Sequence, residues 1–145
     1  MGAIYGLRLV EGPCVIREYT SAATTTYDAG EVVSLADGSV GIGACDACAG
    51  VALKDAGGVT TMTPIIHITP DQIWSIGYNG TTALDMIGDT YLMTFTTGAQ
   101  ILTSTTSTPV VTVVGLDPRD GAKAYGRLLV KFIQSTCNLV GLVLA

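Results

Sequence analysis

Charged residues are scarce in this chain. Only 13% of its 145 residues are Asp, Glu, Lys or Arg, against 48% hydrophobic residues, whereas about a quarter of a typical soluble protein is charged. No apolar run reaches the ~18 residues that a membrane-spanning helix requires. The start, MGAIYGLRLVEG, lacks the basic and apolar regions of a signal peptide. The composition therefore predicts no membrane association, and it favours a protein that hides much of its surface in an oligomer.

Basic residues are scarcer than acidic ones. Seven Lys and Arg stand against twelve Asp and Glu, which gives a net charge of −5. Between Asp28 and Asp120 there are ten acids and only two bases, Lys54 and Arg119. An acidic body repels phosphate, and the sequence has no stripe of basic residues interleaved with aromatic ones. We therefore predict no nucleic-acid partner.

Catalytic residue types are also few. His67 is the only histidine, so a Ser-His-Asp or Cys-His arrangement would have to centre on it. Its neighbours Ile66 and Ile68 predict an apolar strand with the imidazole at the strand surface. Acid pairs such as Asp117 and Asp120 stand beside Gly or Pro, where Asp forms local hydrogen bonds in turns. The sequence predicts no enzyme activity, no cofactor and no small-molecule substrate.

The four cysteines, Cys14, Cys45, Cys48 and Cys137, are too few and too scattered to form a disulfide framework. The motif CDAC at 45–48 has redox-centre spacing, but such a centre needs its first thiol at a helix N-terminus, and no helical pattern follows. Zinc needs four ligands, usually including a second close pair. We predict no metal site, and a thiol or metal protein built on Cys45, Cys48 and His67 is kept as an alternative.

A β-hairpin is the clearest feature that is present. Asp37-Gly38 lies between two short apolar runs, and Asp-Gly is a preferred pair for a two-residue type I′ turn. Closing the hairpin there pairs Leu35 with Val40 and Val33 with Ile42, all on one face. The segment is well specified as scaffold and carries no reactive group.

Alternating and β-branched segments recur along the rest of the chain, separated by turn residues, and this spacing is typical of an all-β barrel or sandwich. Only residues 81–88 could form a helical turn, and Asp117–Gly121, with Pro in second place, predicts a turn. In residues 127–132 the side chains alternate, with Leu128, Val130 and Phe132 on one face and Arg127 and Lys131 on the other. We expect an all-β protein with at most one short helix.

The chain divides near residue 27. Residues 1–27 begin with an alternating run and end in small polar residues, a pattern that predicts an extended N-terminal arm and a linker. Residues 28–145 are then predicted to form the barrel domain.

Several segments resemble, in the same order, the head decoration (cement) proteins of tailed bacteriophages. They are AGEVVSL at 29–35, DG at 37–38, GVALKDA at 50–56, IGDTY at 87–91, VVGLDPRD at 113–120 and GRLLVKF at 126–132. The resemblance covers about residues 28–135. It implies a small barrel of the β-tulip type that assembles as a homotrimer on the outside of the expanded head.

The resemblance also implies a role and a partner. Such a protein is made in the host cytoplasm, becomes part of the virion, binds the major capsid protein and stabilises its lattice against DNA pressure. Its arm would add a strand to a neighbouring sheet, with Ile4, Leu7, Leu9 and Val10 as apolar anchors and Arg8 and Arg17 meeting acidic groups. A tail or fibre-attachment module on a similar barrel is the alternative virion role.

Overall fold

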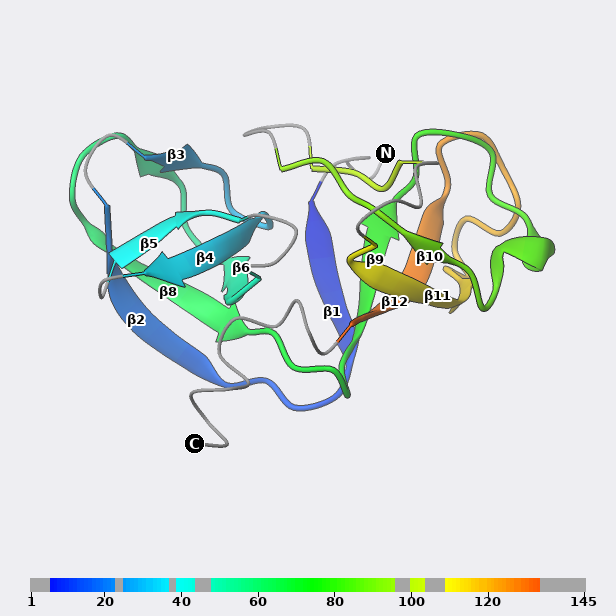
Figure 1. Cartoon of the computed structure of the whole chain (residues 1–145), viewed down its shortest axis with the longest axis horizontal. Coiled ribbons are helices and arrows are strands. Elements are labelled where there is room, and N and C mark those ends of the chain that lie inside the picture. Colours follow the sequence, from blue (N-terminus) through cyan, green and yellow to red (C-terminus); the bar gives the residue numbers. More distant parts are fainter. Residues whose placement is uncertain are drawn as a thin grey trace.

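The computed structural model describes residues 6–22, 25–36, 39–43, 48–95, 100–103 and 109–133. Figure 1 shows two lobes side by side, a closed barrel and a five-stranded sheet, so the predicted all-β fold with a barrel is confirmed. No helix in these residues is long and apolar enough to cross a membrane. The elements are β1 (Leu7–Glu11), β2 (Ile16–Ser21), β3 (Thr26–Tyr27), β4 (Val32–Ala36), β5 (Ser39–Ile42), β6 (Gly50–Ala52), β7 (Ala56–Gly57), β8 (Met62–His67), β9 (Ile73–Gly77), the 3-10 helix η1 (Leu84–Met86), β10 (Thr90–Tyr91), β11 (Val111–Leu116) and β12 (Arg127–Phe132).

The barrel lobe consists of the closed barrel β2-β5-β4-β6-β8 with the short pair β3-β7. The predicted hairpin is confirmed, because β4 pairs with β5 in the register Val33–Ile42 and Leu35–Val40. The turn residues 37 and 38 lie outside the described residues. Alternation sends one side of each strand inward, where Val33, Val40, Ala52, Ile65, Tyr27 and Ala56 form a buried apolar cluster.

The sheet lobe has the strand order β1-β9-β12-β11-β10, with antiparallel pairing throughout. The predicted alternation of 127–132 is confirmed: Leu128, Val130 and Phe132 are buried, whereas Arg127 and Lys131 are partly exposed. The sequence predicts one barrel over residues 28–145, but the barrel ends with β8 and the later strands form this separate sheet. The physical reason is that their large inward side chains, Trp74 foremost, need a second layer to cover them.

The first strands correct the predicted arm. β1 pairs with β9 in the sheet, and β2 pairs with β8 in the barrel. Leu7 is buried in the core and Leu9 packs against it. Because β1 buries its apolar face and gains main-chain hydrogen bonds at the edge of the sheet, the described residues before Asp28 belong to the folded body rather than to an arm.

One apolar core joins the two lobes. Val32, Val51 and Ile68 from the barrel side belong to the same buried cluster as Trp74 and Leu128 from the sheet. The indole of Trp74 also meets the ring of Phe132 edge to face, with the ring centroids 6.5 Å apart. The two lobes are therefore packed against each other through one core and are not merely joined by a linker.

Gln72 lies where the chain passes between the lobes and is 1% exposed. Its Nε2 donates to the carbonyl oxygens of Pro13 at 2.7 Å and His67 at 2.8 Å. Its Oε1 accepts from the backbone N–H of Thr69 at 2.8 Å and from Trp74 Nε1 at 3.1 Å. This one side-chain amide is therefore the hydrogen-bond partner of four polar groups. They belong to Pro13 between β1 and β2, to His67 and Thr69 at the end of β8 and after it, and to Trp74 in the core of the sheet.

Gln100 makes a second connection and is fully buried. Its Oε1 accepts from the Val32 N–H, and its Nε2 donates to the Val32 carbonyl at 3.0 Å, so the amide pairs with β4 as a neighbouring strand would. The Gln100 carbonyl accepts from the Gly6 N–H, and Leu7 N–H donates to the Gly30 carbonyl at 2.7 Å. Within the described residues no buried side-chain nitrogen or oxygen lacks a partner.

Replacing Gln72 with alanine tests the role of this amide. Gln72→Ala leaves several buried polar groups without their partner, so we expect the free energy of unfolding to fall by about 2 to 4 kcal/mol. Urea denaturation followed by circular dichroism measures it. Asn79→Ala, the same loss of an amide at an exposed position, should change the value by less than about 0.5 kcal/mol. Equal effects of the two substitutions would contradict the assignment.

Candidate interaction site around Asp117

The predicted turn after β11 is confirmed. The carbonyl of Asp117 accepts from the N–H groups of Asp120 at 3.0 Å and Gly121 at 2.9 Å, and its Oδ1 accepts from the Arg119 N–H at 3.1 Å. Asp at the first position and Pro at the second are the residues that such a turn favours. The turn holds the Asp117 carboxylate against the sheet, where the residue is only 2% exposed.

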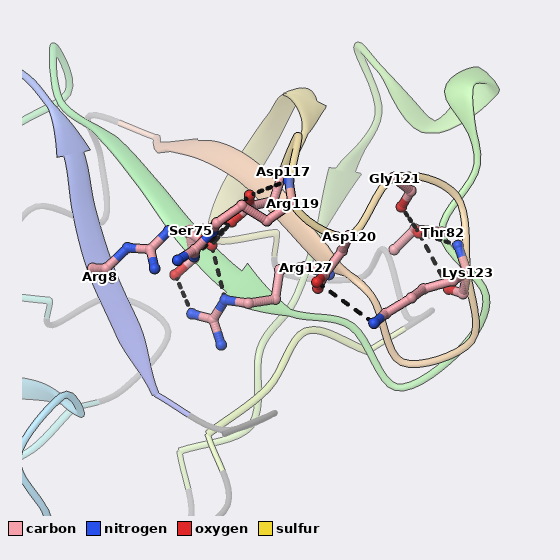
Figure 2. Close-up of polar contacts among 9 residues, drawn as sticks. All are labelled: Arg8, Ser75, Thr82, Asp117, Arg119, Asp120, Gly121, Lys123 and Arg127. Atoms are coloured by element: carbon pink, nitrogen blue, oxygen red, sulfur yellow. Dashed lines mark hydrogen bonds and ion pairs between the residues drawn. The ribbon is translucent and has the colours of Figure 1, made fainter. Parts of the chain in front are cut away.

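Two strands and the turn itself supply hydrogen-bond donors to this carboxylate, as Figure 2 shows. Arg8 from β1 donates to Oδ2 at 3.3 Å, and Arg119 from the turn donates to both oxygens at 3.3 and 3.2 Å. Ser75 from β9 donates its hydroxyl to Oδ2 at 2.7 Å. The carboxylate therefore fastens β1, β9 and the turn together from the outer side of the sheet.

Arg127 at the start of β12 extends the cluster. Its Nε donates to the Ser75 hydroxyl at 2.8 Å, and its Nη2 donates to the carbonyls of Ser75 at 2.7 Å and Gly6 at 2.9 Å. Ser75 thus accepts from Arg127 and donates to Asp117, which links the two charged groups through one hydroxyl. The Arg127 N–H also donates to Asp120 Oδ2 at 2.9 Å.

These contacts set the ionisation of the cluster. Burial raises the pKa of Asp117, but the hydrogen bonds from Arg119 and Ser75 and the Arg119 charge outweigh burial, so the net pKa lies well below the usual Asp value. Burial lowers the pKa of Arg127, and the nearby Arg8 charge lowers it further. Like charges are therefore crowded here around a single buried anion.

The loop that follows the turn is tied to the rest of the sheet lobe. Thr82 Oγ1 donates to the Gly121 carbonyl at 2.8 Å and accepts from the Lys123 N–H at 2.9 Å. Lys123 Nζ lies 3.6 Å from Asp120 Oδ1. These bonds fix the loop, and with it the position of Arg119.

His67 lies in β8, as predicted, but it is not a bare surface residue. Its Nε2 is 3.0 Å from the Tyr19 hydroxyl, and the two rings stack with centroids 6.0 Å apart. Burial lowers the pKa of His67, and the Arg17 charge lowers it further. The pair is a packing contact between β2 and β8 inside the barrel lobe, beside the exposed Arg17.

The two described cysteines differ in their exposure to solvent. Cys48 is buried in the shared core, whereas Cys14 is exposed and has a free thiol. Cys45 and Cys137 lie outside the described residues. Among the residues that the structure describes, no three His, Cys, Asp or Glu side chains are placed to hold a metal ion.

The predicted partner-binding residues fall in different environments. Arg8 belongs to the Asp117 cluster, Val10 is 47% exposed, and Arg17 is exposed on the barrel lobe. Leu7 and Leu9 face the core, and Ile4 lies outside the described residues. The structure thus brings Arg8 together with Arg119 and Arg127, which the sequence did not single out. The local signal of outward-facing cations was the alternation in residues 127–132, which puts Arg127 and Lys131 on the face opposite Leu128.

Comparison with known proteins gives little direct guidance. No protein-family model matches the chain, and no curated protein matches its sequence with significance. One solved structure that matches is that of the head fiber gp8.5 N base in bacteriophage phi29. The two chains are 18% identical, with a TM-score of 0.46, and the match covers 83% of this chain and 96% of that one. Values this low leave the role of this chain to be argued from its own residues.

Replacing Asp117 with asparagine tests the cluster. At pH 7 we expect Asp117→Asn to lower the free energy of unfolding by about 2 to 3 kcal/mol, because charged hydrogen bonds are lost. The native pKa of Asp117 is lowered, so its contribution is present above the unfolded-state value, near pH 4, and is lost as the pH falls further.

Denaturation of both proteins between pH 7 and pH 2 measures this contribution. The difference between wild type and Asp117→Asn should shrink below about pH 4. Asp28→Asn, at an exposed position, is the matched control and should change stability by less than about 0.5 kcal/mol at any pH. A wild-type advantage that stays constant down to pH 2 would contradict the proposed ionisation of Asp117.

Proposed function

We propose that this chain is a structural protein of a bacteriophage virion, a decoration protein that binds the outside of the expanded head as a homotrimer. It contacts the major capsid protein and raises the free energy needed to separate capsid subunits. It works without catalysis, cofactor or metal. Many modest contacts, repeated by the symmetry of the lattice, add up to a large stabilisation.

The order of the resembling segments carries this proposal. They coincide, in sequence, with β4, β6, the residues between η1 and β10 together with β10, the end of β11 with its turn, and β12. A resemblance spread over both lobes, with turns and strands in matching order, concerns the whole fold rather than one motif. Each piece alone consists of common β and turn residues, so the ordered set supports the proposal rather than any single match.

The packing of the molecule also suits a structural role. The shared core and the two buried glutamines hold both lobes in one arrangement, and the Asp117 cluster holds strands of the sheet lobe together. A rigid protein loses little conformational freedom when it binds a lattice, so more of its contact energy goes into affinity. Exposed apolar side chains such as Val59, Leu84 and Ile87 offer surface for such contacts.

Purified protein added to expanded, undecorated heads tests the proposal. We expect saturable binding and a higher temperature of head disruption, because a ligand that binds only the intact lattice stabilises it. Heads that already carry the protein serve as the control and should take up no more. Absence of saturable binding, or binding without any gain in heat resistance, would contradict the decoration role. Binding to isolated tails instead would favour the tail or fibre-attachment role.

A further inference from the structure

The outer face of the five-stranded sheet is rich in cations. Leu7, Trp74 and Leu128 point into the core, so the neighbouring residues on these strands point outward. Arg8, Ser75 and Leu129 form one row across β1, β9 and β12. On β12, Arg127 and Lys131 flank Leu129 on the same side. Arg119 joins this face through its contact with Asp117.

The cations of this face are only partly neutralised. The Asp117 carboxylate is buried and is shared between Arg8 and Arg119, whose side chains stay 48% and 60% exposed. In the described contacts Arg8 donates one side-chain hydrogen bond, through Nη2, although a guanidinium has five donors. Glu11 lies on the same side at the far end of β1, opposite Ile73. The centre of the face therefore presents guanidinium donors to solvent.

The barrel lobe, in contrast, carries a net negative charge. Residues 16–67 contain six acids and two bases, a net charge of −4 out of the −5 of the whole chain. On its outer side β2 pairs with β8 in the register Ile16–Ile66, Glu18–Pro64 and Thr20–Met62. Ile16 and Met62 are 52% and 50% exposed, and Glu18 is exposed between them. This β2–β8 face combines apolar surface with a carboxylate.

We propose that the outer face of the sheet binds the β2–β8 face of a second copy of this chain. The two faces complement each other in charge, and the contact covers apolar side chains that a single copy leaves in water. Because the two faces differ, the contact is head to tail, and such contacts close into a ring when the rotation between copies allows. The inference rests on the homotrimer of the proposed function and names its interface.

Analytical ultracentrifugation of the full chain, over a range of micromolar concentrations, measures this contact. Lys131→Glu reverses a charge on the outer face without touching Asp117, and we expect it to raise the trimer dissociation constant at least about tenfold. Glu18→Arg, on the opposite face, should weaken the trimer similarly. The double variant should regain much of the lost affinity, because both faces again carry opposite charges.

Lys54→Glu is the matched control, since it makes the same change in net charge at an exposed residue outside the strands that form the two faces. It should leave the dissociation constant within about twofold of wild type. Melting temperatures of all variants, followed by circular dichroism, separate weakened assembly from unfolding.

The other outcomes overturn the inference in distinguishable ways. A trimer unaffected by Lys131→Glu and Glu18→Arg would place the subunit interface elsewhere, with head binding intact. Loss of head binding by a Lys131→Glu trimer would assign the cationic face to the capsid instead. A wild-type monomer at all concentrations would remove both the trimer and this interface, and the head-binding assay would then judge decoration alone.

Discussion

Two sheets that share one apolar core must satisfy every polar group where they meet, and the rest of this structure depends on how that is done. Gln72 bonds to both segments that connect the lobes, and Gln100 pairs with the backbone of β4. Each buried polar group left without a partner at this boundary would cost about 1 to 3 kcal/mol. With these amides in place, Trp74 and its neighbours can pack between the lobes without leaving orphaned backbone groups.

The Asp117 cluster solves a related problem on the outside of the sheet. Among the described residues β1 is an edge strand that pairs within the sheet with β9, and Arg8 ties it across β9 to the turn after β11. The cost of burying one carboxylate is offset by two arginines and a hydroxyl. A consequence is that a protein with few charges gathers several of its cations on one face, while the barrel lobe remains acidic. In the interface that we propose, stability and surface recognition draw on the same residues.

Local features could be predicted from the sequence, whereas contacts across long stretches of chain could not. The Asp37-Gly38 hairpin, the turn at Asp117 and the alternation of β12 each depend on residues a few positions apart, and their patterns are specific. Arg8 and Asp117 are 109 positions apart, and no local pattern encodes that pairing. The alternating run that contains Leu7 and Leu9 is equally typical of a strand that pairs within its own chain and of an arm that pairs with a partner. The arm was predicted for that reason.

A rigid two-lobed body with a cationic face on the sheet lobe and a net negative charge on the barrel lobe is well suited to ordered assembly on a surface. We propose that this surface is the outside of a phage head. Cryo-electron microscopy of intact virions, compared with virions from phage lacking the gene, tests that claim most directly. We expect three-fold density on the outer capsid surface that disappears with the gene and accommodates both lobes. Density at the tail, or virions with no difference between the two samples, would contradict it.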